Sequence, residues 1–172
     1  LNFPIVIKPN DEGSSIGVKI CNNIVSLKKQ FEKSKKNYKN LIFETYIPGK
    51  EVQVAVMGGK SIGAIELRPK RKFYDYEAKY NPKAKTEHII PVKITNNNYN
   101  KVTSLALKAH NLLKCRGVTR SDFRFYKDKF YLLETNTQPG MTSLSLVPEI
   151  ASYKGISFIQ LIETIIKDAS IN

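Results

Sequence analysis

Cysteine and histidine are scarce in this 172-residue chain, which has two of each. Cys21 and Cys115 lie far apart and provide neither the spacing of a metal site nor a disulfide framework. Long apolar runs are also missing, because stretches such as residues 41–43 and 143–147 are far too short to cross a bilayer. Two free cysteines suit a reducing compartment, so we expect a cytoplasmic protein with no membrane segment.

Acidic residues are outnumbered, at 15 Asp and Glu against 28 Lys and Arg, which gives a net charge of +13. Such an excess fits a nucleic-acid surface. It equally fits a lysine-rich background in which a few cations serve a small phosphorylated substrate. The lysines between residues 28 and 39 are dispersed along a predicted solvated helix face, and no nucleic-acid-binding motif interleaves with them. We therefore expect no nucleic-acid partner and keep a basic nucleic-acid-binding domain as an alternative.

The pattern of apolar residues predicts short elements of both kinds. Strands are expected at residues 4–8, 17–20, 41–46, 51–57, 62–68, 118–126 and 129–135, and helices at 24–36, 100–115 and 157–168. Strands and helices mix without regular alternation, which favours an α+β fold. His110 falls in the second helix and is interpreted as an ordinary helix residue. Residues 69–98 are polar and weakly periodic and predict a long, functional loop.

Oxygen-bearing side chains gather on two of these strands. If the turn between them centres on Asp128, Asp122 lies opposite Glu134, and Arg120 lies opposite Asn136. Opposed side chains on one sheet face approach within about 5 Å, and two carboxylates that close call for a positive partner. A divalent cation such as Mg²⁺, which prefers hard oxygen ligands, would provide it. The alternative, that Arg120 and Arg124 alone neutralise the pair, stays open.

Two further segments could hold a nucleotide, although each is weak alone. Lys8 ends a strand and precedes a loop with Ser14 and Ser15, whose backbone amides could bind phosphate. Glu51 follows the Pro-Gly turn after residues 43–47 and could accept hydrogen bonds from ribose hydroxyls. Ordinary explanations, a common Gly-Ser hairpin and a simple turn between domains, compete with both.

The order of these motifs resembles the ATP-grasp superfamily and, within it, the D-alanine:D-alanine ligases. The matching segments run from end to end of the chain: VIKPNDEGSSIGV, FETYIPGKEVQVAV, FYDYEAKY, GVTRSDF and FYLLETNTQPGMTSLSLVP. The resemblance implies mostly antiparallel sheets flanked by helices, with a nucleotide between two subdomains, at residues 1–49 and 50–172. It also implies a lid loop at about 69–98. Because the chain starts without Met and almost directly in a strand, we expect a fragment that lacks an N-terminal domain.

The resemblance also implies an ATP-dependent reaction that joins two D-alanines through an acyl phosphate, for peptidoglycan precursor synthesis. Two Mg²⁺ ions, or Mn²⁺ in their place, would be held by Asp122, Glu134 and Asn136. ATP would be held by Lys8, Ser14, Ser15, Glu44, Tyr46, Ile47 and Glu51. Arg120 and the amide of Gly140 would stabilise the tetrahedral oxyanion, Lys79 and Ser145 would bind the second D-alanine, and Tyr80 would reach towards Ser14.

Two departures from the family pattern bear on these assignments. Thr45 stands where many relatives have a basic residue, which puts a side-chain contact with adenine in doubt. Thr135 replaces a small apolar residue between two metal ligands, but it should point to the other sheet face. The full-length protein is expected to be a homodimer, and the fragment alone is expected to be inactive. Another ATP-grasp carboxylate–amine ligase remains an alternative within the same superfamily.

Overall fold

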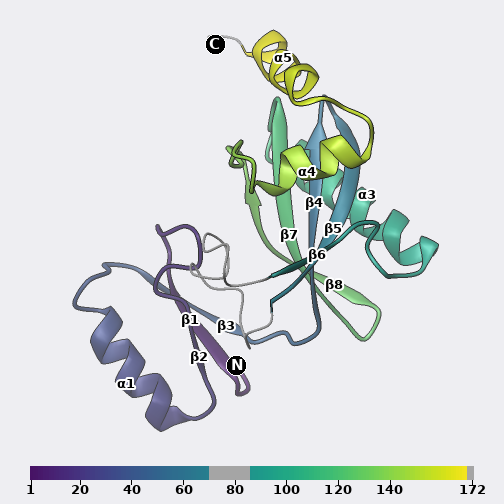
Figure 1. The fold of residues 1–172 in the computed structure, drawn as a ribbon. Helices are drawn as coiled ribbons and strands as arrows, with labels where there is room; N and C mark the ends of the chain where they lie inside the picture. Colours follow the sequence, from purple (N-terminus) through teal and green to yellow (C-terminus); the bar gives the residue numbers. More distant parts are fainter. Residues whose placement is uncertain (70–85, 170–172) are drawn as a thin grey trace. The chain divides into compact units, whose positions relative to one another are not determined.

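A computed structural model describes residues 1–69 and 86–169, which form two compact units, each with its own sheet (Figure 1). The first unit is built on Leu1–Ile47. The second is built on Pro48–Arg68 and on the chain from Glu87 onwards. No helix in the described residues is long and apolar enough to span a membrane.

The first unit is a three-stranded antiparallel sheet with one helix. Its elements are β1 (Ile5–Pro9), β2 (Lys19–Cys21), α1 (Ile24–Ser34) and β3 (Leu41–Thr45), and its strand order is β2-β1-β3. Residues alternate along β1 between buried and half-buried positions, so that Ile5 and Ile7 face the core. A capping box between Asn23 and Ser26 starts α1. The predicted hairpin of β1 and β2 is confirmed by their antiparallel pairing.

The second unit is a five-stranded antiparallel sheet in the order β6-β5-β4-β7-β8. Its strands are β4 (Lys50–Met57), β5 (Lys60–Arg68), β6 (Glu87–Ile89), β7 (Val118–Tyr126) and β8 (Lys129–Asn136). Its helices are α3 (Asn96–Leu112), α4 (Leu146–Tyr153) and α5 (Phe158–Asp168). The antiparallel sheets and flanking helices confirm the α+β prediction.

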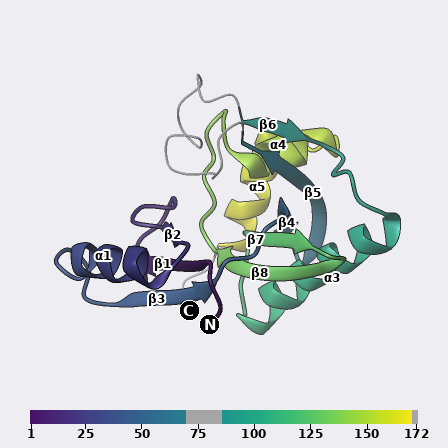
Figure 2. The same cartoon turned by 90° about the horizontal axis from the view of Figure 1, so that it is seen from below.

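The two faces of this sheet are covered differently, with α3 on one side and α4 on the other (Figure 2). Val52, Val54 and Phe123 pack with Val102 and Ala106 of α3 into one buried cluster. On the opposite face, α4 approaches β5 so closely that a Cβ on Gly63 would lie 2.8 Å from Ile150 Cγ2. Gln53 and Asp122 are directly paired and alternate with the α3-facing residues, so they lie on the α4 face.

The long loop predicted at residues 69–98 is wrong at its C-terminal end. Residues 70–85 lie outside the described part of the chain, but Glu87–Ile89 form strand β6 and α3 begins at Asn96. The helix starts early because the Thr95 side chain accepts a hydrogen bond from the Asn98 backbone amide. Helix α4 was not predicted, because Pro148 interrupts an eight-residue run; proline is tolerated there because the first turn of a helix needs no N–H donor.

Candidate functional site

Strands β7 and β8 bring the predicted oxygen ligands together. Asp122 pairs directly with Glu134, and Arg120 pairs directly with Asn136, as the sequence predicts. Thr135 is paired with Ser121, and their hydroxyl oxygens are 3.0 Å apart, so Thr135 does point away from the ligand face. The four side chains of the two pairs therefore form one polar patch on the α4 face of the sheet.

The turn that leads to this register differs from the predicted one. Lys127 and Asp128 form a two-residue turn with φ values of 48° and 57°, and Phe125 pairs with Phe130. This register alone would place Asp122 opposite residue 133. The pairing shifts between Asp122 and Phe123, so that Leu133 is an extra residue on β8, a β-bulge that returns Glu134 to its place opposite Asp122.

The two carboxylates have different surroundings. Asp122 is buried and accepts two hydrogen bonds from the guanidinium of Arg120, at 2.8 Å from Nε and 3.0 Å from NH2. Glu134 is exposed and has no ion-pair or hydrogen-bond partner among the described residues. Arg120 therefore neutralises Asp122 and leaves the carboxylate of Glu134 available to a ligand.

A second pair of an arginine and a carboxylate lies along the same face. Arg124 is 3.4 Å from a carboxylate oxygen of Glu51 and donates to the backbone oxygen of Gly49 at 2.8 Å. The Glu51 side chain is 13% exposed, so little of it meets solvent. Arg124 thus holds the first residues of β4, where Glu51 is the candidate for ribose hydroxyls.

Gln53 is a candidate site residue that the sequence did not predict. It is fully buried and lies between the two carboxylates, directly paired with Asp122 and two residues from Glu51. Its amide nitrogen donates to Glu51 at 3.4 Å, while its Oε1 has no hydrogen-bond partner in the described residues. A buried acceptor without a partner costs about 1–3 kcal/mol, and a functional role is one of the explanations for such a group.

The loop after β8 brings Gly140 next to Ser145. A Cβ on Gly140 would lie 2.8 Å from Ser145 Oγ, so only glycine fits there without displacing that hydroxyl. Ser145 Oγ also accepts a hydrogen bond from the Thr142 amide at 3.0 Å and lies 3.0 Å from Thr142 Oγ1. Ser145 is the N-cap residue of α4, so this short loop and the start of α4 form one hydrogen-bonded turn.

In the first unit, Lys8 and Glu44 form a salt bridge of 2.8 Å on neighbouring strands. Both are half-buried, so the cation expected for phosphate already has a partner. Ser14 and Ser15 both have positive φ, at 54° and 62°, a strained conformation typical of binding loops. Tyr46 and Ile47 follow directly after β3, and the Tyr46 amide donates to Pro4 at 3.0 Å. Lys79 and Tyr80 lie outside the described residues.

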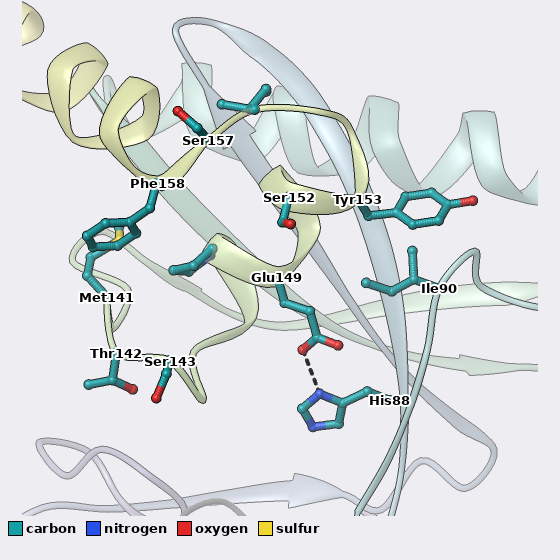
Figure 3. Close-up of a pocket in the computed structure, with 12 residues that line it drawn as sticks. His88, Ile90, Met141, Thr142, Ser143, Glu149, Ser152, Tyr153, Ser157 and Phe158 are labelled. Carbon is teal, nitrogen blue, oxygen red and sulfur yellow. Dashed lines mark hydrogen bonds and ion pairs between the residues drawn. The ribbon is translucent and has the colours of Figure 1, made fainter.

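A cleft of about 860 Å³ lies on the second unit beside the loop 141–143 (Figure 3). It is lined by the loop, α4, the start of α5 and β6, and none of the carboxylates on β7 and β8 lines it. His88 Nδ1 and Glu149 Oε2 lie 2.6 Å apart at its edge. The sequence could not predict this contact, because β6 and α4 are both short and 61 residues separate the partners.

Comparisons with known proteins agree along almost the whole chain. A model of the family described as "D-ala D-ala ligase C-terminus" matches residues 1–167. D-alanine–D-alanine ligases are similar to the chain in sequence: the Pelagibacter ubique (strain HTCC1062) protein is 62% identical over 172 residues. One from Wolbachia sp. subsp. Drosophila simulans (strain wRi) is 46% identical and matches 98% of the chain.

Solved structures of the same kind of ligase are also similar. The enzyme from Bacillus anthracis matches 96% of the chain with a TM-score of 0.84 and 34% identity, and the match covers 54% of that enzyme. A structure of it complexed with ATP has a TM-score of 0.81, with 31% identity over 97% of the chain and 53% of the enzyme. The chain spans about half the length of the relatives it matches, with 56% and 54% for the two bacterial sequences.

Proposed function

Because the chain belongs to the D-alanine–D-alanine ligase family, whose C-terminal part it matches, we propose that the whole protein joins two D-alanines at the expense of ATP. The fold expected from the sequence, an α+β ATP-grasp arrangement, is confirmed by the same similarities. The observation that best supports the activity is the pairing of Asp122 with Glu134, next to Arg120 and Asn136, just before the Gly140 turn.

The proposed reaction starts with the carboxylate of one D-alanine, which attacks the γ-phosphorus of ATP to give an acyl phosphate and ADP. The amine of the second D-alanine then attacks the acyl carbon. A tetrahedral intermediate forms, loses a proton from nitrogen and expels phosphate, leaving D-alanyl-D-alanine. Such chemistry needs positioning and charge neutralisation more than a protein nucleophile, which fits a site rich in cations and oxygen ligands.

Roles follow from the chemistry of each side chain. Lys8 and the strained loop of Ser14 and Ser15 bind the phosphates, while Glu44, Tyr46 and Ile47 contact adenine and Glu51 binds the ribose. Arg120 and the Gly140 amide donate to the oxyanion of the tetrahedral intermediate, where preorganised donors are most effective. Ser145, with Lys79, binds the carboxylate of the second D-alanine. Tyr80 and the segment around it would exclude water from the acyl phosphate.

The residues on β7 and β8 fit two Mg²⁺ ions. No group of three or more His, Cys, Asp and Glu side chains gathers in the described part of the chain, but Mg²⁺ bound with a nucleotide needs only one or two carboxylates besides phosphate and water. Glu134 has no protein partner in the described residues, and Gln53 Oε1 lacks a donor beside it. Asp122, Glu134 and Asn136 would hold the ions, which neutralise phosphate charge when bound.

Asp122 and Asn136 already have protein partners in this structure. Arg120 donates to both oxygens of Asp122, and the Gln138 amide donates to Asn136 Oδ1 at 2.9 Å. A carboxylate offers about four acceptor sites and an amide oxygen two. Both side chains therefore keep lone pairs for a cation. Mn²⁺, which accepts the same oxygen ligands, could replace Mg²⁺.

The cellular setting follows from the reaction. D-alanyl-D-alanine serves peptidoglycan precursor synthesis, and thereby cell shape, so a cytoplasmic enzyme is proposed, with ATP and D-alanine as its small-molecule partners. A homodimer is proposed for the full-length protein. Another ATP-grasp carboxylate–amine ligase is the second candidate, because the same ligands would serve any acyl phosphate.

The test is phosphate release by the full-length protein with D-alanine, compared with L-alanine, glycine and D-serine. We expect ATP-dependent release that is fastest with D-alanine and matched by equimolar D-alanyl-D-alanine. A matched protein with Glu134→Gln should release almost none. Release that is fastest with a different amino acid would favour the second candidate, and no release with any of them would contradict both.

A further inference from the structure

His88 and Glu149 join two elements that no other side-chain hydrogen bond or ion pair in the described residues connects. His88 is the middle residue of the edge strand β6, and Glu149 lies in the first turn of α4. Their Nδ1 and Oε2 atoms are 2.6 Å apart, and their side chains are 28% and 39% exposed. In Figure 3 the two side chains point towards each other across the edge of the cleft, away from Phe158 and Met141.

Glu149 lies one helical turn after Ser145. The Glu149 amide donates to the Ser145 carbonyl at 3.4 Å, and Ser145 Oγ takes part in the turn that contains Thr142 and Gly140. The backbones of Glu149 and Ser145 are therefore linked, so that a shift of one affects the other. The contact with His88 acts on the residue best placed to fix that turn.

Apolar packing holds α4 on the sheet. Val147, Ile150 and Ala151 are buried, and Ile150 packs against Gly63. Apolar burial is non-directional, so it defines the position of a two-turn helix less sharply than a polar contact does. A short polar contact is directional. His88 is the only described residue whose side chain makes such a contact with α4.

We propose that His88 and Glu149 are a positioning pair that fixes the first turn of α4, and with it Ser145, for the carboxylate of the second D-alanine. This inference rests on the proposed function. Neither residue touches the reacting atoms. The expected consequence of losing the pair is weaker binding of the second D-alanine, with ATP binding and the phosphoryl-transfer step preserved.

The helix itself does not need the pair. A carboxylate in the first turn is favourable because of the positive end of the helix dipole, so Glu149 stabilises α4 even without His88. Removal of His88 should therefore leave a folded helix in a less defined position. This separates a positioning role from a purely structural one.

The test is a set of variants in the full-length protein: His88→Ala, Glu149→Ala, the double variant and His88→Gln. The rate of dipeptide formation is measured at varied D-alanine concentrations and fitted with one Michaelis constant for the first D-alanine and another for the second. Each Ala variant should raise the constant for the second molecule roughly tenfold, the effect expected for loss of a charge-assisted hydrogen bond. The ATP constant and kcat should change less than about twofold. The double variant should match the single ones because the residues act as a unit.

Two comparisons keep the test sharp. His88→Gln keeps a hydrogen-bond donor and should recover most of the binding, and Ser152→Ala, on the same helix and the same cleft, should change nothing. Unfolding curves show whether each variant is folded. If His88→Ala does not fold, the constants for the second D-alanine are compared between His88→Gln and His88→Leu instead, and that difference tests the positioning role. Unchanged second-substrate constants in an active protein would overturn the positioning role alone. Failure of the unmodified protein to make D-alanyl-D-alanine would overturn this inference and the proposed function together.

Discussion

Asp122 and Glu134 face each other but depend on the fold in different ways. Asp122 is 4% exposed, and a buried carboxylate is costly unless it is paired, as Arg120 pairs it here. Glu134 is exposed and has no hydrogen-bond or ion-pair partner among the described residues. We therefore expect Asp122 to be needed for both folding and ligand binding, and Glu134 for ligand binding only.

Glu134→Gln should reduce turnover of the full-length protein at least about 100-fold, because it removes a negative charge that would help to hold the phosphate-bound cations. Its free energy of unfolding should change by less than about 0.5 kcal/mol, as at other exposed sites. Asp122→Asn should lower both the turnover and the free energy of unfolding. Steady-state rates and urea unfolding check this, with Glu163→Gln on α5 as the exposed control. Near-normal turnover of Glu134→Gln would remove Glu134 from the site.

His110 should make the stability of the chain depend on pH. Burial lowers its pKa, and Asp168 opposes this with a smaller rise; the neutral ring lies 2.9 Å from Thr119 Oγ1. Because the pKa is lower in the folded state, the unfolded chain binds more protons, and stability rises with pH. The stabilisation is complete above the pKa of His110 in the unfolded chain, about 6.5, and is lost as pH falls towards the lower pKa of the folded state.

Urea unfolding at several pH values between about 5 and 8 should show this slope. His110→Gln should flatten the part of the slope near and below about pH 6.5. An identical slope with and without His110 would show that other groups cause the pH dependence.

At the scale of elements, the sequence predicted β7 with its correct bounds and the partners on the ligand face. The prediction that Asp122 lies opposite Glu134 rested on a turn assumed to centre on one residue. The actual turn has two residues, and the bulge at Leu133 compensates. Bulges depend on local twist and packing that alternation does not reveal. Short elements such as β6 were missed for a related reason, since three residues carry no measurable period.

The turn between β7 and β8 should respond differently at its two positions. Lys127 has a φ of 48°, which lysine adopts at a cost, so Lys127→Asn should raise the free energy of unfolding by about 0.5–1 kcal/mol. Asp128 accepts a hydrogen bond from the buried side chain of Asn98 at 3.1 Å. Asp128→Gly should therefore lower the free energy of unfolding by about 1 kcal/mol, although glycine itself adopts the positive φ of this position readily. Equal effects at both positions would show that the contact with Asn98 is unimportant.

The net charge of +13 is a sum over the whole sequence. Several cations are already engaged by carboxylates: Lys50 and Arg68 pair with Glu66. This buried carboxylate and its partners lie on the α3 face, away from the candidate site. The favourable ion pairs with Glu66 and Glu87 raise the pKa of Arg68. In such pairs the basic groups are engaged by neighbouring carboxylates rather than exposed alone to a polyanion.

The full-length protein should therefore bind duplex DNA only weakly. At about 0.15 M salt, no saturable complex is expected at protein concentrations near 1 µM, the range where non-specific binding begins. Mobility shift with a random duplex checks this, with Mg-ATP binding measured on the same sample. Tight DNA binding without ATP binding would support the nucleic-acid alternative.

The reaction of the whole protein is tested most directly by the fate of the carboxylate oxygens. D-alanine labelled with ¹⁸O in its carboxylate is incubated with ATP and the full-length protein, and the phosphate and dipeptide are analysed by mass spectrometry. An acyl phosphate transfers one carboxylate oxygen to phosphate for each D-alanyl-D-alanine formed, so we expect one ¹⁸O per phosphate released. Dipeptide that forms without label in the phosphate, or phosphate released without dipeptide, would contradict the account.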